Sequence, residues 1–314
     1  MAISTKVTLG HRIEDAGFAA FLNTFGAMSP ASASAAGASL LRALGPLTSA
    51  HRTALRNLRL AFPNETEAWR RDIARAMWGE VGRMAGEFPH MHAYRTEARG
   101  GSIKVEGAER LNEAARTGAV FIAGHFSNWE IMAVAIVQSG VTCHVTYRPA
   151  NNPLIDRRIV EGRRAYGVNL QSAKGAEGGM GLMRALARKE TVALMNDQKY
   201  NEGVAAPFFG HDCMTADGPA RLALRFKVPL VPLSLKRTAP QAFVATVHPA
   251  IPLDYDAPLD DGVVAGVREV NAFMEARVRE APEQWFWVHQ RWPKSAWRDA
   301  GIIPSPPGGQ GYRI

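Results

Sequence analysis

From about Gly101 onward, short runs rich in β-branched residues alternate with stretches of helical periodicity. The runs that predict strands are AVFIAG, VTCHVTYR, TVALMND, VPLVPLSLK and FVATVHPA. The stretches that predict helices cover about 128–138, 153–166, 178–189, 217–227 and 262–281. Such alternation favours a largely parallel sheet, because parallel strands need crossover connections whose helices cover the sheet. We therefore expect an α/β domain over residues 101–300, with a mixed, largely parallel sheet flanked by helices.

Residues 1–100 have a different texture and predict an N-terminal helical region. The segments SAHRTALRNLRLAF and ETEAWRRDIARAMWGEVGRMAGEF space their apolar residues three and four apart. The small-residue segment MSPASASAAGASLLRAL fits a linker, a closely packed helix or a helix lying on a surface, and its composition does not separate these. At the other end, PSPPGGQGYRI predicts a flexible tail over residues 301–314.

Charge and cysteine content limit the possible partners and location. The chain of 314 residues has a net charge of +8, so its surface should attract nucleic acid, anionic lipid or phosphorylated substrates. Its two cysteines, Cys143 and Cys213, are too few for a disulfide framework, which favours a reducing, cytoplasmic setting. The mildly apolar stretch 13–28 contains Glu14 and Asp15, so we expect neither a signal peptide nor a spanning helix there. Membrane contact is expected to be peripheral.

The stretch GHFSNWE, residues 124–130, has two interpretations. Ser127 and Glu130 match a capping box, in which the serine caps the following helix and the glutamate bonds back to it. Alternatively, His125 is a general base at the carboxyl end of a strand, where open α/β sheets bind ligands, and Glu130 orients its ring. The pattern alone leaves the two interpretations balanced.

Further polar residues follow the later predicted strands. Arg148 ends one strand, and Asn152 and Pro153 open a helix that contains four arginines. Four arginines on a helix usually form a solvated face, although guanidinium groups also bind phosphate well. Asp197 and Gln198 end the next strand. A loop with the sequence PFFG then leads to Thr215 and Gly218 before another helix, which fits either a ligand-binding loop or a loop packed by its own phenylalanines.

Together these blocks resemble the lysophospholipid acyltransferase superfamily, and more narrowly the bacterial lauroyl/myristoyl acyltransferases of lipid A biosynthesis. The similarity runs from about Arg52 to Trp292. The residues that produce it are RTALRNLRLAFP, GHFSNWE as the His-x4-acid motif, YRPANNPLID, NDQ, PFFG with the Thr and Gly after it, and PEQWFWVHQRW. The His-x4-acid motif alone is weak, but six blocks in the right order are specific.

The resemblance implies a glycerolipid acyltransferase-like fold and the transfer of a fatty acyl group without a covalent intermediate. The donor would be a thioester of acyl carrier protein or CoA, and the acceptor a hydroxyl of a phosphorylated glycolipid such as a lipid A precursor of lipopolysaccharide. His125 would be the base and Glu130 its orienting carboxylate, with no metal or organic cofactor and no nucleic acid involved. Substrate-binding residues would be Arg148, Asn152, Arg163, Asp197, Gln198, Thr215 and Gly218.

The location implied by the resemblance is the cytoplasmic face of the inner membrane. Many relatives begin with a transmembrane helix, whereas this chain has only the diluted segment around Phe18 to Met28. We therefore expect peripheral or weak attachment to an anionic membrane surface through amphipathic helices and basic residues.

Three alternatives stay open. A lysophospholipid acyltransferase would typically show a block like FPEGTR where this chain has NDQKYNEG. A phosphatidylinositol mannoside acyltransferase with acyl-CoA as donor would use much the same motifs. A non-enzymatic basic membrane-binding protein would not need His125.

In the terminal EQWFWVHQRW, the alternating Trp285 and Trp287 predict a strand packed on the core, and His289 and Arg291 are candidate head-group contacts.

Overall fold

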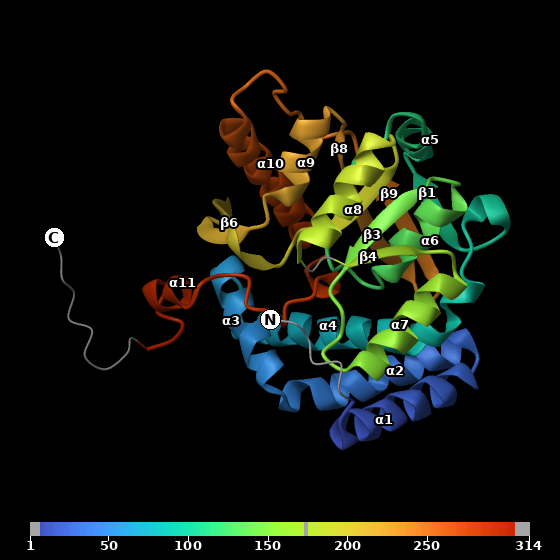
Figure 1. Ribbon diagram of the computed structural model, residues 1–314. Helices are drawn as coiled ribbons and strands as arrows, with labels where there is room; N and C mark the ends of the chain where they lie inside the picture. The colour runs from blue at the N-terminus through green and yellow to red at the C-terminus, as the bar shows by residue number, and fades with distance from the viewer. Residues whose placement is uncertain (1–6, 173–174, 305–314) are drawn as a thin grey trace.

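The structure is a computed structural model that describes residues 7–172 and 175–304. Its centre is a seven-stranded sheet with the order β1-β9-β8-β2-β5-β3-β4 (Figure 1). The strands are β1 (Ile103–Glu106), β2 (Val120–Ala123), β3 (Cys143–Tyr147), β4 (Asn169–Ser172), β5 (Thr191–Met195), β8 (Leu230–Ala239) and β9 (Ala242–Val247). All neighbouring pairs in this sheet are parallel except β8 with β9. The mixed, largely parallel sheet expected from the sequence is confirmed.

Helices cover both faces of the sheet, as the alternating pattern predicts. One face packs against α5 (Ala108–Thr117) and α6 (Glu130–Gln138), and the other packs against α8 (Gly175–Ala187), α9 (Gly218–Phe226) and α10 (Leu259–Glu280). On β2, Phe121 packs on the face covered by α5 and α6, and Ile122 packs on the opposite face, because successive side chains of a strand point to opposite faces. Helix α7 (Pro153–Ala165) follows β3.

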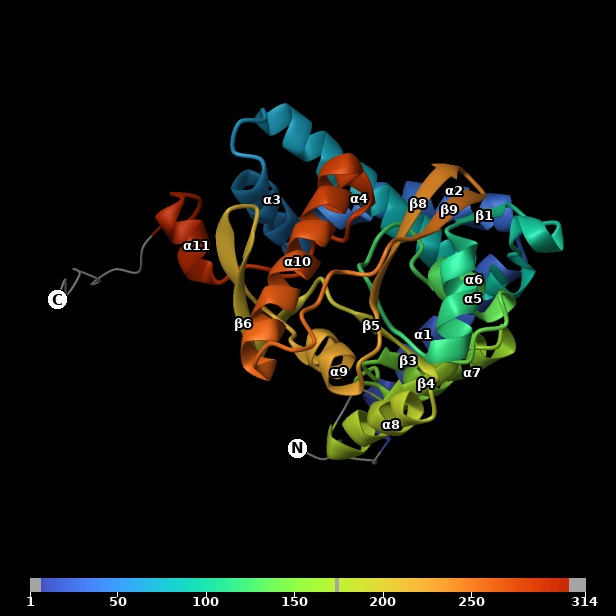
Figure 2. The same cartoon turned by 90° about the horizontal axis from the view of Figure 1, so that it is seen from above.

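Four helices before residue 101 lie together along one side of the sheet (Figures 1 and 2). They are α1 (Leu9–Gly26), α2 (Pro30–Leu44), α3 (Ser49–Ala61) and α4 (Glu67–Glu87). The small-residue segment forms α2, which packs so closely on α4 that a Cβ on Gly37 would lie 2.1 Å from the carbonyl oxygen of Gly82. Of the three alternatives for this segment, the closely packed helix is therefore observed.

The segment 284–292 differs from its prediction. Trp285 and Trp287 are fully buried, as expected, but the segment forms no regular strand and has only one isolated bridge, between Trp285 and Phe126. Its aromatic rings pack on Phe208 and Phe209, which belong to a β-hairpin of β6 (Lys199–Phe208) and β7 (His211–Thr215). The buried tryptophans alternate with the half-buried Phe286 and Val288, which gives the strand-like pattern, although the segment pairs with no neighbouring strand beyond that bridge. Most of the predicted tail, residues 305–314, lies outside the described residues.

Candidate active site

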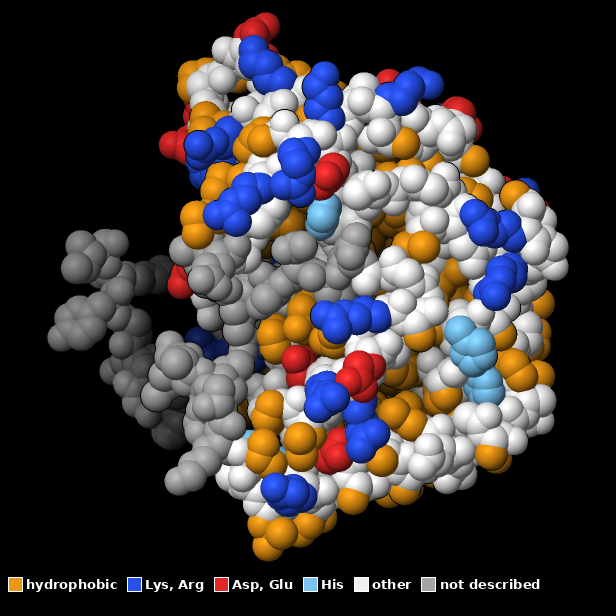
Figure 3. Space-filling view, turned by 45° about the vertical axis from the view of Figure 1, so that its right-hand side comes forward, with side chains coloured by type: hydrophobic (Ala, Val, Ile, Leu, Met, Phe, Trp, Pro, Cys, Tyr) orange, Lys and Arg blue, Asp and Glu red, His pale blue; other side chains and the backbone are white. Residues whose placement is uncertain are grey.

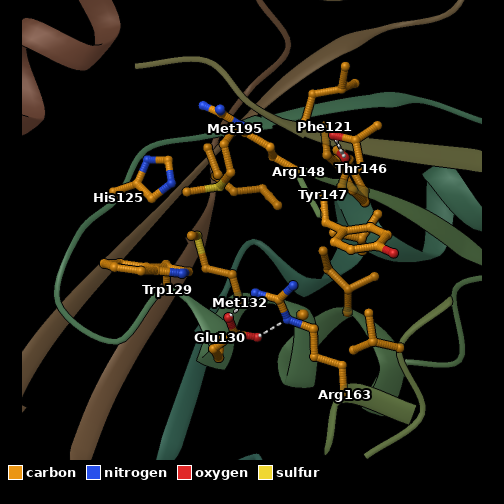
Figure 4. A pocket seen from close by; sticks show the side chains of 18 of the residues that line it. Phe121, His125, Trp129, Glu130, Met132, Thr146, Tyr147, Arg148, Arg163 and Met195 are labelled. Carbon is orange, nitrogen blue, oxygen red and sulfur yellow. Dashed lines mark hydrogen bonds and ion pairs between the residues drawn. The ribbon is translucent and has the colours of Figure 1, made fainter. Parts of the chain in front are cut away.

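A cavity of about 500 Å³ opens where β2, β3 and β5 end, between these strands and α6. Its polar end contains His125, Glu130, Arg148, Arg163 and Gln198 (Figure 4). The rest of its lining is mainly apolar and comes mostly from the sheet and α6: Phe121, Ala123, Trp129, Met132, Ala133, Ile136, Val145, Thr146, Tyr147, Val168, Ala193, Leu194, Met195 and Leu233. A few polar groups beside a deep apolar lining are typical of a site for a lipid or another amphiphilic ligand.

His125 follows β2 and is held by Asp197, which follows the neighbouring strand β5. The ring Nδ1 lies 2.7 Å from Oδ1 of Asp197, and the backbone N–H of His125 donates to Oδ2 over 2.7 Å. The indole N–H of Trp285 donates to the same Oδ2 over 2.8 Å. With Nδ1 donating to the carboxylate, Nε2 is the ring nitrogen left for the cavity, which His125 lines. Ring orientation and tautomer are therefore both fixed, as a general base requires.

Asp197 is fully buried but stays ionised. Burial opposes the charge of this carboxylate, but the charge of His125 and its hydrogen bonds outweigh burial and hold the pKa of Asp197 below its usual range. The carboxylate is thus a negative charge behind the imidazole, placed where it would stabilise a protonated ring.

The expected pairing of Glu130 with His125 is wrong. The Glu130 carboxylate accepts hydrogen bonds from Arg163 at 3.0 and 2.6 Å (Figure 4). It also accepts one from the hydroxyl of Tyr166 at 2.5 Å. The sequence spacing favoured an acid one helical turn after the histidine, but α6 begins at Glu130 itself, so this side chain reaches α7 instead. Asp197 occupies Nδ1 of His125 and is the orienting carboxylate.

The expected capping box is not formed either. The hydroxyl of Ser127 donates to Glu80 of α4 over 2.8 Å, its backbone N–H donates to the carbonyl of Gln284 over 2.7 Å, and Asn128 accepts the N–H of Glu130 over 3.3 Å. Ser127 has a φ of 48°, a left-handed conformation that a serine adopts at a cost. Side-chain and backbone hydrogen bonds from α4 and from residue 284 hold this turn next to His125.

Behind the turn lies a buried ion-pair network. Arg237 of β8 donates to Glu87 from both terminal guanidinium nitrogens at 2.8 and 2.9 Å, and to Glu80 from Nε at 2.8 Å. Glu87 also accepts from Ser34 at 2.7 Å and from Asn128 at 2.8 Å. Each charge in this network has an opposite charge and further hydrogen bonds, which is the condition for burying it. The helices before residue 101 are therefore fastened to the loop that presents His125.

The predicted arginines have different partners. Arg148 lines the cavity, and it makes no hydrogen bond or ion pair with any part of the chain that the structure describes. Arg163 lines the cavity but is bound to Glu130. On the same helix, Arg157 pairs with Glu161 and Arg158 with Asp15, so these two belong to the surface, as the solvated-face interpretation predicts.

Three predicted binding residues lie elsewhere. Asn152 caps α7 and bonds to the carbonyl of His11 and the carboxylate of Glu14. Thr215 is buried and accepts a hydrogen bond from Arg291 over 2.7 Å. Gly218 begins α9. None of the three lines the cavity in the described residues, and each has a local structural role instead.

Sequence reasoning missed the parts played by Tyr166, Trp129 and Trp285. The hydroxyl of Tyr166 donates a hydrogen bond to the Glu130 carboxylate. Trp129 packs edge-on against the His125 ring, with the ring centroids 4.9 Å apart. The predicted end of the helix over 153–166 was a usable signal for Tyr166, because this residue lies at the end of α7 that reaches α6. For Trp285 no local signal exists, since its contact with Asp197 spans 88 residues.

Comparison with known proteins shows the family to which the chain belongs. The sequence profile of the bacterial lipid A biosynthesis acyltransferases matches residues 12–294. A lipid A biosynthesis acyltransferase of Haemophilus influenzae is 27% identical over 247 residues, which are 76% of either chain. The lipid A biosynthesis lauroyltransferase of Escherichia coli is 27% identical over 75% of this chain and 76% of its own, and the palmitoleoyltransferase of that organism is 24% identical over 76% and 77%. The chain therefore belongs to the bacterial lipid A biosynthesis acyltransferase family.

Proposed function

We propose that this enzyme transfers a fatty acyl chain from a thioester, of acyl carrier protein or CoA, to a hydroxyl of a phosphorylated lipid A precursor. The observation that supports this most strongly is the His125–Asp197 pair at the polar end of an apolar cavity. The acyltransferase class follows from the family, and the roles of the residues below are our proposal.

His125 acts as the general base. Its Nε2 takes the proton of the acceptor hydroxyl while the hydroxyl oxygen attacks the thioester carbonyl carbon. The carbon–sulfur bond breaks, the sulfur leaves as thiolate, and the imidazolium returns the proton to it. The buried Asp197 stabilises the imidazolium between the two proton transfers. A thioester is already activated, so alignment and one proton transfer suffice and no covalent enzyme intermediate is needed.

The apolar part and the polar end of the cavity fit the acyl chain and the phosphorylated acceptor. The apolar lining between α6 and the sheet suits the acyl chain. Among the described residues Arg148 has no counter-charge, and its guanidinium lies beside the polar end, where a phosphate of the acceptor would bind. Glu130 binds Arg163 and Tyr166, so we assign it a structural role in the cavity wall and not the role of orienting His125.

Attachment to the cytoplasmic face of the inner membrane is the location we propose. Among the described residues, no helix combines the length and apolar character that crossing a membrane demands. The first helices instead expose large apolar side chains, and such side chains gather along the lower edge of the molecule in Figure 3, together with lysines and arginines. The exposed residues are Leu9, Ile13, Leu40, Leu44 and Leu47. Exposed apolar and basic side chains together favour peripheral binding to anionic lipid.

The test of the activity supplies the purified enzyme with labelled acyl carrier protein or acyl-CoA and one of three acceptors: a phosphorylated glucosamine lipid, lysophosphatidate, or a phosphatidylinositol mannoside. Mass spectrometry identifies the acylated product. We expect acylation of the glucosamine lipid, and a loss of roughly 10²–10⁴-fold in His125→Ala. The exposed His92 gives a matched control, since His92→Ala should keep full activity. Acylation of another acceptor alone, or an active His125→Ala, would overturn the proposal.

Membrane binding is tested by sedimentation with anionic phosphatidylglycerol vesicles. The double variant Leu44→Asp, Leu47→Asp should bind these vesicles more weakly than the wild type. Leu259 is similarly exposed but begins α10, far from α1 and α2 (Figure 1), so Leu259→Asp should bind normally. Equal binding by all three proteins would contradict the assignment of this surface.

A further inference from the structure

A second, smaller cavity lies beside the one that contains His125. It has a volume of about 10 Å³, room for roughly one water-sized group. The two cavities share three lining residues, Met132 and Ile136 of α6 and Leu233 of β8. We call these three residues the partition. Each is at least 95% buried.

The geometry of α6 explains the partition. Met132 and Ile136 are four residues apart and therefore lie on one face of the helix, one turn above the other. That face meets Leu233 on the adjacent sheet. The wider cavity extends from the partition over β2, β5 and β3, and the second cavity extends over β8, β9 and β1. The second cavity is mainly apolar, with Val105, Leu111, Ala135, Ala245 and Val247 in its lining.

Ile136 is the member of the partition farthest along α6 from the base. It lies seven positions after Trp129, which at 1.5 Å per residue places its backbone roughly 10 Å further along the helix than that of Trp129, whose ring contacts His125. An acyl chain whose thioester carbon lies at His125 would run along α6 towards Ile136. The buried side chain there would stop the acyl chain from continuing into the second cavity.

We propose that Ile136, supported by Met132 and Leu233, limits the length of the acyl chain that the enzyme transfers, and that the second cavity is unused space into which a longer chain can extend once this side chain is shortened. This inference rests on the proposed acyl transfer and specifies the selectivity of that site. A rigid, close-packed wall can set a length limit because protein interiors yield little to an extra methylene.

The test measures competition among acyl donors that differ by two carbons, with the products separated by mass. Ile136→Ala should shift the preferred chain towards longer acyl groups by roughly two carbons, and raise the preference for the longer donor on the order of tenfold. Ile136→Val should give a smaller shift in the same direction. Thermal unfolding of each variant shows whether it is folded, and Ile136→Val is a milder change if the alanine variant is unstable.

Helix α6 provides a matched pair of controls. Ala133 lines only the wider cavity and Ala135 lines only the second one. Ala133→Leu should shift the preference towards shorter chains. Ala135→Leu should leave the preference of the wild type unchanged, but in combination with Ile136→Ala it should cancel the shift by filling the space beyond the partition.

The outcomes separate this inference from the proposed function. If the wild type transfers acyl groups and folded Ile136→Ala and Ile136→Val variants keep the wild-type length profile, the partition does not set the limit. A shift in Ile136→Ala that Ala135→Leu fails to cancel would also contradict the role of the second cavity. If the wild type transfers no acyl group to any acceptor, the proposed function itself fails.

Discussion

Nδ1 of His125 lies 2.7 Å from a carboxylate oxygen of Asp197, although the two residues are 72 positions apart in the chain. They meet because His125 follows β2, Asp197 follows β5, and these strands are parallel neighbours in the sheet. The carboxyl ends of such strands lie at one edge, which is where α/β proteins place their ligands. The order of the strands in the sheet therefore decides which carboxylate lies beside the histidine ring.

The guanidinium of Arg148, which has no partner in the part of the chain that the structure describes, gives the first prediction. Arg148→Ala should raise KM for a phosphorylated acceptor by roughly 10-fold or more, because a charge-assisted hydrogen bond to phosphate is lost. The KM for the same lipid without its phosphate should hardly change. Steady-state kinetics with the two acceptors make the comparison.

Arg157→Ala is the control for Arg148, since Arg157 is exposed and paired with Glu161. It should leave both KM values unchanged. An equal effect of Arg148→Ala on the KM of both acceptors would show that Arg148 does not recognise the phosphate.

The buried network around Arg237 gives a prediction about stability. Arg237→Met should lower the free energy of unfolding by about 3–5 kcal/mol, because the change leaves Glu87 buried without its counter-charge. Adding Glu87→Gln should recover part of this loss, since the unpaired charge is then gone. Urea unfolding of the two single variants and the double variant measures the coupling.

Additive effects of the two changes would show that the Arg237–Glu87 pair is not coupled. Arg279 pairs with Glu275 on the surface of α10, so Arg279→Met serves as the comparison and should cost at most about 1 kcal/mol.

His289 gives a prediction about pH. Burial lowers the pKa of this histidine to about 4, against the attraction of Asp197. The unfolded chain therefore binds a proton at His289 near pH 6.5, whereas the folded protein does so only near pH 4. The contribution of the neutral ring to stability is complete above pH 6.5 and is lost as the pH falls between these two values.

Denaturant unfolding at a series of pH values checks this contribution. The free energy of unfolding should decline less steeply below pH 6.5 in His289→Gln than in the wild type. An identical decline in the two proteins would contradict the burial of a neutral imidazole.

Much of the fold is predictable because its signals are local. The strands that contain Phe121 and Ala193 and the helices after them have hydrophobic patterns that a single segment reveals. The hairpin of β6 and β7 was harder to predict from the sequence, because the PFFG segment fitted a loop packed by its own phenylalanines equally well. Its phenylalanines pack instead on tryptophans almost 80 residues further along, and no local pattern encodes such a contact.

The site was predictable to the extent that it follows strand ends. Arg148, Asp197 and Gln198 were assigned to the correct edge of the sheet because each follows a recognisable strand. The partner of His125 was not predictable in this way, because nearness in sequence favoured Glu130 and only the pairing of β2 with β5 brings Asp197 beside the ring. The burial of Thr215 under Arg291 likewise depends on a contact across 76 residues.

The central claim is that Asp197, and not Glu130, orients the imidazole that we propose as the base. The most direct measurement is kcat/KM for acyl transfer in the wild type, Asp197→Asn and Glu130→Gln. Asp197→Asn should lower kcat/KM by roughly 10²–10⁴-fold, because the imidazole loses the carboxylate that fixes its tautomer and stabilises its protonated form. Glu130→Gln should lower kcat/KM by a clearly smaller factor, because Glu130 contacts Arg163 and Tyr166 and not the ring. A wild-type rate in Asp197→Asn, or a larger loss in Glu130→Gln than in Asp197→Asn, would contradict the claim.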